Sequence, residues 1–471
     1  MLWLRRVVFY AFLLVYLIAC PLTILYAFGY VFRPGTEQGL LKTGVLSLST
    51  APPGAAIYLN NRRYTRLTPA VLQGLLPGTY RLKVTRKGYE PWTRAVSIEA
   101  EKATVLDRVL LLPKIPRSAV LLPEPFDALL PIPDTRFLLL MKGARLGDVV
   151  VYDWASAEWW PLLPRGSPWA EGVAAPPVVM RGSPFVLVRA KLAGGEAFLW
   201  VELRNHETRL TDLTRLFPSH PLAVAWDPLA PDQLFSLQDG IVNRLEVGAM
   251  AIYPGLADRV RGLGASNRQL YVLTEDHTLQ RRDVDGRLLE TVFGIPRTGE
   301  PLFGAKSVFH LTALSDERVL LLGERGEFIA VQRPFRLVEE GVRRFEFDAR
   351  RQRLLVWRKD RLGVLDLASA EAGEALPRQP ELRWVFEKGR DIEQAFWVYE
   401  GSHILLQDNG VVALLASEPE GEPAVRELLR VRSGHSVFYA DESGLLYYLD
   451  RTTGRLSSLE ILPGREPGFS R

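Results

Sequence analysis

The sequence predicts a mostly β protein in which an N-terminal transmembrane helix is followed by a small β-sandwich and then a seven- or eight-bladed β-propeller. Three observations predict it: an almost unbroken apolar run at 7–32, alternating short strands over 44–112, and a repeated strand–turn–strand theme over 134–462. The remaining segments are a short cytoplasmic N-terminus, a linker, a Pro-rich linker and a tail, at 1–6, 33–43, 113–133 and 463–471.

The apolar run from Val7 to Phe32 predicts a membrane-spanning helix. At roughly 1.5 Å per residue this helix would be about 39 Å long, enough to cross a hydrocarbon core of about 30 Å. Arg5 and Arg6 precede the run directly, whereas Arg33 stands alone behind it. Because basic residues favour the cytoplasmic side, we expect a single-pass cell-membrane protein with its C-terminal domains extracytoplasmic.

The apolar run has two alternatives to an uncleaved anchor. A cleaved signal peptide has an apolar region of about 7–15 residues and a small-residue cleavage site, and this run is longer and lacks such a site. The stretch Leu17–Cys20 resembles the lipobox of bacterial lipoproteins, which would make Cys20 a lipidated N-terminus. Pro21 and a further apolar stretch follow that cysteine, so the sequence favours the anchor. Either route attaches the protein to a membrane.

Composition limits the remaining possibilities. A chain of 471 residues with 47% hydrophobic and 24% charged residues can bury two or three cores and is not disordered. A net charge of +4 offers no electrostatic argument for a nucleic-acid partner. Cys20 is the only cysteine, which excludes an intrachain disulfide and a thiolate metal site.

The segment 44–112 alternates apolar and polar residues in short runs separated by turn residues, which predicts six strands and a small β-sandwich. The six are Val45–Ser49, Ala56–Leu59, a short segment after Thr68-Pro69, Tyr80–Val84, Trp92–Ile98 and Thr104–Leu111. Between the second and third, Asn60-Asn61 suits the positive φ angles of a tight hairpin.

The turns of this segment resemble those of the PEGA domain. The matching motifs are Pro52-Pro53-Gly54-Ala55, Ile57-Tyr58-Leu59, Thr68-Pro69, Leu75-Leu76-Pro77-Gly78-Thr79-Tyr80 and Lys87-Gly88-Tyr89. Pro53 replaces the glutamate of the family name, and we expect the turn to survive because its backbone demand falls on Gly54. The resemblance implies a non-catalytic bacterial surface module, commonly placed beside membrane anchors and larger repeat domains.

The repeat over 134–462 is carried by eight apolar strands whose starts fall 35 to 50 residues apart, the period of a four-stranded propeller blade. These strands, which we interpret as the inner ones, are Phe137–Met141, Phe185–Val188, Leu234–Leu237, Leu270–Leu273, Val319–Leu322, Leu354–Trp357, Ile404–Leu406 and Leu445–Leu449. Hairpin turns follow at Asp239-Gly240, Arg325-Gly326 and Asn409-Gly410. Trp226-Asp227 and Gly434-His435 occur once each, so the period and not a WD signature indicates the propeller. A pair of sandwiches or a β-solenoid remains the alternative.

Catalytic and metal-binding chemistry has little support. The histidines (His206, His220, His277, His310, His403 and His435) are scattered, and no nucleophile, zinc or phosphate-binding motif is present. Asp283–Gly286 with Glu290 fails EF-hand spacing and is better read as a hairpin turn. We therefore predict no catalytic, cofactor-binding or metal-ligating residue and no cofactor.

Two clusters could instead bind partners. Basic and aromatic residues alternate over Arg343–Arg361, where strand alternation favours a solvated outer face over a nucleic-acid surface. Trp154, Trp159, Trp160 and Trp169 lie close in sequence and could form a platform for a sugar or a protein, although buried blade aromatics are the plainer explanation.

The expected function is that of a membrane-anchored extracytoplasmic binding or scaffold protein of the bacterial cell envelope. Its propeller would engage an envelope protein or a cell-wall glycan, and no nucleic acid. The alternative is a propeller hydrolase or lyase that acts on envelope polysaccharide through carboxylates and histidines at the channel mouth.

Overall fold

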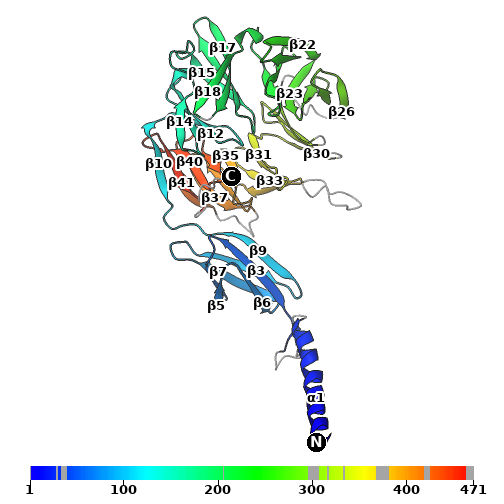
Figure 1. The fold of residues 1–471 in the computed structure, drawn as a ribbon. Coiled ribbons are helices and arrows are strands. Elements are labelled where there is room, and N and C mark those ends of the chain that lie inside the picture. The colour runs from blue at the N-terminus through cyan, green and yellow to red at the C-terminus, as the bar shows by residue number, and fades with distance from the viewer. Residues whose placement is uncertain are drawn as a thin grey trace. The chain divides into compact units, whose positions relative to one another are not determined.

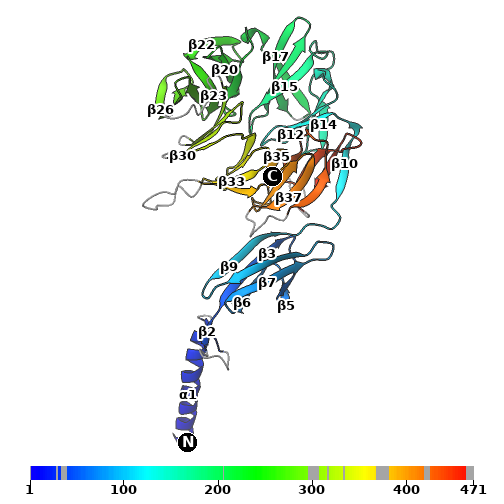
Figure 2. The ribbon, with the colours of Figure 1, turned by 180° about the vertical axis from the view of Figure 1, so that it is seen from behind.

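The computed structural model describes residues 2–27, 30–32, 40–204, 206–294, 307–315, 318–332, 335–367, 381–417 and 425–462. The chain divides into two compact units. One holds the residues up to Ser118 with two short C-terminal stretches, and the other holds 119–440 and 446–458. Figures 1 and 2 show the two units from opposite sides, and each is described by itself.

The N-terminal helix α1 spans Leu2–Ala27, so it begins and ends five residues earlier than the predicted 7–32. The limits of the apolar run are not the limits of the helix. The helix starts before the run because the leucines and arginines there are good helix formers. Tyr30–Phe32 forms β1, paired antiparallel with β2 (Leu40–Lys42), as expected for β-branched and aromatic residues. In the part of the chain that the structure describes, no helix meets the combined requirement of length and apolar character for crossing a membrane. Residues 33–39 of the predicted linker lie outside the described residues.

Seven strands, one more than predicted, form the β-sandwich. They are β3 (Gly44–Ala51), β4 (Ala56–Leu59), β5 (Arg62–Leu67), β6 (Ala70–Leu75), β7 (Gly78–Thr85), β8 (Trp92–Ile98) and β9 (Ala103–Leu110). One sheet has the order β6-β3-β9 and the other β5-β4-β7-β8, with Leu46, Ile57 and Leu82 fully buried between them. The missed strand, β5, is an exposed edge strand, so its sequence lacks the apolar alternation that marks a half-buried strand.

The turns of the sandwich meet the backbone demands expected of them. Gly54 has φ +82°, a left-handed conformation that disfavours side chains, so the turn depends on Gly54 and tolerates Pro53. Asn60 and Asn61 both have positive φ, as predicted for the hairpin between β4 and β5. The Thr68 hydroxyl accepts a hydrogen bond from the Ala55 N–H at 2.9 Å and ties the turn to the next strand.

In the residues that the structure describes, the large unit contains eight blades of four strands each. Blade 1 is β11–β14, blade 2 β15–β18, blade 3 β19–β22, blade 4 β23–β26, blade 5 β27–β30, blade 6 β31–β34, blade 7 β35–β38, and blade 8 β39–β41 with β10. The bounds are β10 Ser118–Pro125, β11 Ala128–Pro131, β12 Phe137–Met141, β13 Val149–Asp153, β14 Glu158–Pro161, β15 Val173–Val179, β16 Phe185–Leu192, β17 Gly195–Arg204, β18 Glu207–Asp212, β19 Ala223–Trp226, β20 Gln233–Gln238, β21 Ile241–Glu246, β22 Ala251–Ala257, β23 Val260–Ser266, β24 Gln269–Thr274, β25 Thr278–Asp283, β26 Leu288–Gly294, β27 Phe309–Ser315, β28 Arg318–Gly323, β29 Phe328–Gln332, β30 Phe335–Glu339, β31 Arg344–Asp348, β32 Arg353–Trp357, β33 Leu362–Asp366, β34 Leu382–Phe386, β35 Ile392–Val398, β36 His403–Asp408, β37 Val411–Ala416, β38 Arg426–Arg430, β39 Phe438–Ala440, β40 Leu445–Leu449 and β41 Arg455–Glu460.

The eight predicted inner strands are the second strands of the blades: β12, β16, β20, β24, β28, β32, β36 and β40. The first strands lie nearer the axis, since β23 of blade 4 pairs directly with β27 of blade 5. The predicted strands are therefore real, but the prediction that they are the innermost strand of each blade was wrong: they are the second strand from the axis. Second strands such as β32 are buried on both faces and read as continuous apolar runs, whereas a first strand such as β31 carries charge.

The blades close into a ring, which excludes an open solenoid or two sandwiches. β10 precedes blade 1 in sequence but forms the outer edge of blade 8, next to β41. At the same junction the ring of Tyr152 in blade 1 lies 6.4 Å from that of Tyr447 in blade 8. The predicted Pro-rich linker 113–133 is correspondingly wrong over most of its length, because its residues form β10 and β11. Prolines are accommodated there because β10 is an edge strand.

Asp450 stabilises the β40–β41 turn that completes the last blade. Its carboxylate accepts hydrogen bonds from the side chains and backbone N–H groups of Thr452 and Thr453, which lower its pKa to about 2. A carboxylate whose pKa is lowered by folding adds stability above its unfolded pKa of about 3.8, and that stability is lost as the pH falls toward 2.

Replacing Asp450 by alanine should therefore cost about 1 kcal/mol at pH 7, since the site is only partly buried, and much less at pH 2.5. Urea unfolding followed by circular dichroism at both pH values checks this. Asp258→Ala, which removes an exposed carboxylate without a partner among the described residues, should change little at either pH. An Asp450→Ala deficit that is equal at both pH values would contradict the role of the ionised carboxylate.

Candidate functional site

A cavity of about 190 Å³ lies where the first strands of blades 6 and 7 begin and where the loop before β39 of blade 8 passes. We call it the blade 6–8 cavity. It is lined by Arg343, Arg344, Glu393, Gln394, Gln407, Gly434, His435 and Ser436. All the charged and polar groups come from strand ends and one loop, so three blades must assemble before the cavity exists.

Hydrogen bonds already occupy the one carboxylate of the cavity. Glu393 accepts from the Ser433 hydroxyl at 2.7 Å, from the Gly434 N–H at 2.9 Å and from the Gln407 side-chain amide. The Gln394 amide oxygen accepts from the Val437 N–H at 2.7 Å. The carboxylate of Glu393 therefore holds the loop before β39 in place through these hydrogen bonds.

Several other groups in the cavity have no partner in the described chain. Arg344 is exposed and makes no hydrogen bond or ion pair there, whereas Arg343 pairs with Asp391 at 2.7 Å. Gln407 is 1% exposed, yet its amide oxygen has no donor, and His435 Nδ1 is buried without a partner. Buried polar groups without partners are rare in folded proteins because each costs free energy. These groups make the cavity the best candidate binding site.

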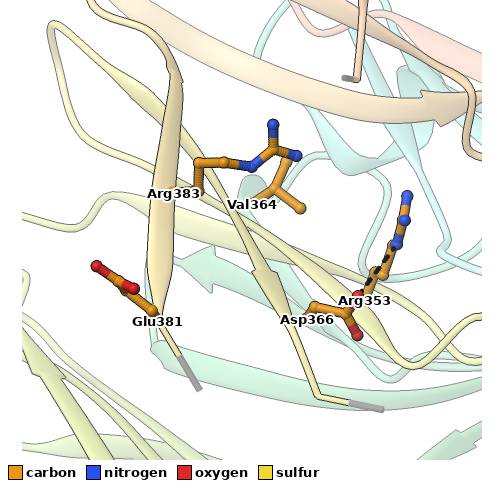
Figure 3. A pocket seen from close by; sticks show the side chains of 5 residues that line it. All are labelled: Arg353, Val364, Asp366, Glu381 and Arg383. Carbon is orange, nitrogen blue, oxygen red and sulfur yellow. Dashed lines mark ion pairs between the residues drawn. The ribbon is translucent and has the colours of Figure 1, made fainter. Parts of the chain in front are cut away.

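A larger cleft, of about 440 Å³, lies on blade 6. Figure 3 shows the Arg353–Asp366 ion pair on one side and the Glu381 carboxylate pointing away from it. Arg353 and Asp366 are 3.8 Å apart, and Arg383 donates to the Ser417 carbonyl at 3.3 Å. The charges are mixed in sign and do not converge on one point, so the cleft lacks the geometry of an acid pair or a metal site.

An arginine reaches between blades at the axis. Arg181, in the turn between β15 and β16, pairs with Glu346 of blade 6 at 2.7 Å and with Asp134 of blade 1 at 3.3 Å. It also donates to the Phe347 carbonyl at 3.0 Å. Blades 2 and 6 stand four blades apart in an eight-bladed ring, so this contact braces the ring across its axis. Asp134 and Glu346 are both held by Arg181, which leaves neither of the two free as a general acid or base.

The histidines do not gather into one site. His403 is the most suggestive, because its Nδ1 lies 2.8 Å from the Ser402 hydroxyl. That hydroxyl donates to the Tyr399 carbonyl at 2.8 Å, so His403 must be the donor to serine and cannot act as its base. Burial lowers the pKa of His403 to about 4 and keeps it neutral at pH 7.

The other histidines have partners spread around the ring. His206 contacts Glu158 at 2.9 Å, His220 contacts Glu196 at 2.7 Å and Arg189 at 3.0 Å, His277 contacts Arg261 at 2.7 Å, His310 lies on β27, and His435 lines the blade 6–8 cavity. Of the six, sequence reasoning had no signal to select His435, since its neighbours in the cavity come from other blades.

The acidic turn on blade 4 is a hairpin turn between β25 and β26. Asp283 accepts hydrogen bonds from the N–H groups of Asp285 and Arg287, and Gly286 has φ +86°. Asp285 pairs with Arg244 at 2.6 Å. The residues that the structure describes contain no group of three or more side chains that could hold a metal ion.

The basic stretch 343–361, predicted to be a solvated strand face, contains arginines that are partly buried and ion-paired. Arg351 pairs with Asp348 at 3.3 Å, Arg358 pairs with Glu339, and Arg361 lies 3.6 Å from Glu387. Acidic residues therefore neutralise these three arginines locally, whereas Arg344 at the start of the stretch has no such partner among the described residues.

The four tryptophans do not form a platform. Trp160 is buried in the core between blades 1 and 2, and Trp169 packs against the same core. Trp159 is half exposed, at 50%. Trp154 lies 6.4 Å from Phe438 of blade 8, and its indole N–H donates to the Thr135 carbonyl at 3.2 Å. The structural explanation, in which most of these rings fill blade cores and junctions, is the one observed.

Comparisons with known proteins support the domain assignment but not a function. A search of curated proteins found none whose sequence matches the chain significantly. Among solved structures, the Dos1 propeller has 11% identity and a TM-score of 0.47, and covers 75% of this chain and 95% of its own. BamB from Moraxella catarrhalis has 12% identity and a TM-score of 0.44, covering 74% and 99%. At these scores the likeness carries no argument, and the fold assignment rests on the strand pairing described above.

The family of the small unit is decided by its sequence. The PEGA domain model matches residues 43–111, within one residue of the predicted limits at each end. The matched segment coincides with the seven-stranded sandwich β3–β9 and contains the glycine-dependent turn at Gly54. The chain therefore carries a PEGA domain, followed by an eight-bladed β-propeller.

Proposed function

We propose that this chain is a membrane-anchored, extracytoplasmic binding or scaffold protein of the bacterial cell envelope, with the propeller as the binding domain. The observation that carries the proposal is the blade 6–8 cavity, in which a closed β ring holds polar groups that the fold itself does not use. A rigid ring that positions such groups around a cavity at its strand ends is suited to hold a partner in a defined orientation.

The anchor part of the proposal is supported by the surface of α1. Its side chains between Val7 and Ile18 are apolar and exposed. They are Val7, Val8, Phe9, Tyr10, Phe12, Leu13, Leu14, Val15, Tyr16, Leu17 and Ile18. An apolar surface of this size is unfavourable in water and is characteristic of a membrane or partner contact. The arginine pair before the run supports an extracytoplasmic position for the domains that follow.

The competing proposal, a hydrolase or lyase acting on envelope polysaccharide, has weaker structural support. Its expected site was a carboxylate pair at the channel, and the carboxylates found at the axis, Asp134 and Glu346, are bound by Arg181. A turnover assay of the full chain on wall polysaccharides is its direct test.

Crosslinking in intact cells tests the binding proposal. The full chain is expressed with a C-terminal tag, crosslinked, purified from the membrane fraction and identified by mass spectrometry with whatever accompanies it. We expect one envelope protein or wall glycan to be recovered reproducibly. A matched variant with Leu13→Arg and Leu14→Arg should leave the membrane fraction and recover no such component, because charged residues are costly in hydrocarbon. Equal recovery from both, or recovery of nothing by the wild type, would contradict the proposal.

A further inference from the structure

We infer that the blade 6–8 cavity recognises an acidic peptide segment of a partner protein, through a carboxylate and an adjacent backbone N–H. The inference rests on the proposed function and adds the chemistry of the ligand to it. The cavity holds about 190 Å³, a volume suited to one side chain and its peptide unit and too small for a folded domain.

The free donors of the cavity call for an acceptor, preferably a charged one. Arg344 has no ion pair among the described residues, and a carboxylate is the partner whose geometry a guanidinium matches in two parallel hydrogen bonds. Gln394 is 9% exposed, and its amide oxygen is engaged by Val437. The NH₂ group of the same amide has no hydrogen-bond partner among the described residues, so both its N–H bonds are available to a ligand in the cavity.

The neighbouring negative charges do not compete for this ligand. Glu393 is the only carboxylate in the lining, and it accepts three hydrogen bonds from blades 7 and 8. Asp391 is paired with Arg343 at 2.7 Å. The charge left over at the cavity is therefore the positive charge of Arg344.

The unpartnered acceptor identifies the second part of the ligand. The Gln407 amide donates to Glu393 and to the His435 carbonyl at 2.8 Å, which assigns its nitrogen and leaves its oxygen as the atom without a donor. A bare carboxylate offers no donor at pH 7, whereas a peptide backbone supplies an N–H beside its acidic side chain. Among the described residues that line the cavity there is no Phe, Tyr or Trp to stack on a sugar ring, so this lining favours a peptide over a glycan.

Fluorescence anisotropy tests the inference with defined probes and the full chain in detergent micelles. The probe is a fluorescein-labelled peptide with two adjacent glutamates between glycines, and its partner probe has glutamines instead. We expect the glutamate peptide to bind at least about tenfold more tightly, with an affinity that falls as salt is added.

Two exposed arginines, one on β31 and one in the turn after it, provide the matched variants. Arg344→Gln at the start of β31 should weaken binding of the glutamate peptide at least about tenfold, because a charge-assisted hydrogen bond is lost. Arg350→Gln removes an equally exposed arginine just past the other end of β31 and should leave affinity within about twofold. Gln394→Glu, which keeps the acceptor for Val437 but repels a carboxylate, should abolish binding while the melting temperature shows that the blade is intact.

Each other result overturns the inference. The inference that the cavity binds a carboxylate is contradicted if both peptides bind equally or if neither binds measurably. It is also contradicted if Arg344→Gln and Arg350→Gln have equal effects. Binding of a polygalacturonate oligosaccharide that depends on Arg344, without peptide binding, makes the ligand an acidic glycan instead. The proposed function fails separately, since it is judged by whether wild-type crosslinking recovers any envelope component.

Discussion

Replacing Trp226 by alanine should lower the free energy of unfolding of the propeller by about 3–5 kcal/mol, the largest effect expected of a point change in this chain. Trp226 lies on β19 in the core between blades 2 and 3 and is 0% exposed. Its ring packs edge-to-face on Trp200 with centroids 4.8 Å apart, and its indole N–H donates to the Ser183 hydroxyl at 3.0 Å. The substitution leaves a cavity and removes one of the two hydrogen bonds that the buried Ser183 hydroxyl accepts, the other coming from the Phe185 N–H.

Trp159→Ala is the matched control for Trp226→Ala. Trp159 lies on β14 and is 50% exposed, so its removal should change stability by no more than about 0.5 kcal/mol. Guanidinium unfolding of both variants, followed by far-ultraviolet circular dichroism, measures the difference. A loss below about 1 kcal/mol for Trp226→Ala would mean that blades 2 and 3 repack freely around the gap, against the close packing described here.

Gly264→Ala should destabilise the propeller by about 1–3 kcal/mol although it adds only a methyl group. The two first strands β23 and β27 pair directly in parallel, with Leu263 opposite His310, and this joins blades 4 and 5 into one eight-stranded sheet. A Cβ at Gly264 would lie 2.4 Å from the Leu311 carbonyl oxygen and 2.8 Å from the Leu311 Cβ. Since backbone cannot move aside as a flexible side chain can, the strands would have to separate.

The control for Gly264→Ala is Gly194→Ala, in the β16–β17 turn. A Cβ there meets nothing within 4 Å and the backbone does not have positive φ. The change should be neutral or slightly stabilising, because alanine restricts the unfolded chain. Thermal unfolding of the two variants beside the wild type separates them. Equal melting temperatures for Gly264→Ala and Gly194→Ala would contradict the close pairing of β23 and β27.

Much of the fold could be read from local sequence pattern. A strand buried on both faces is a continuous apolar run, so all eight second strands were located, two of them, Phe137–Met141 and Leu445–Leu449, with the observed bounds. Turns that need positive φ can be predicted from residue type, because Asn, Asp and Gly tolerate that conformation, as at Asn60-Asn61, Asp239-Gly240 and Asn409-Gly410. The PEGA limits were predicted for the same reason, since its motifs are turn motifs.

Strands without apolar alternation escaped prediction. β5 is an exposed edge and β31 carries charged residues toward the axis, so neither has the period of a half-buried strand. β10 and β11 were hidden by prolines, which edge positions tolerate. In each case the position of the strand in its sheet, which is a tertiary fact, decides which residues are allowed.

The candidate site was beyond the reach of the sequence. Arg344, Gln394, Gln407 and His435 stand far apart in the chain and belong to three blades, and none has a spacing that signals a shared role. The sequence by itself determined the strands, the turns, the blade period and the PEGA domain, because those depend on residues a few positions apart. The tertiary structure alone decided that there are eight blades, that β10 closes the ring and which side chains meet in the cavity, because those depend on how the strands of distant blades pack.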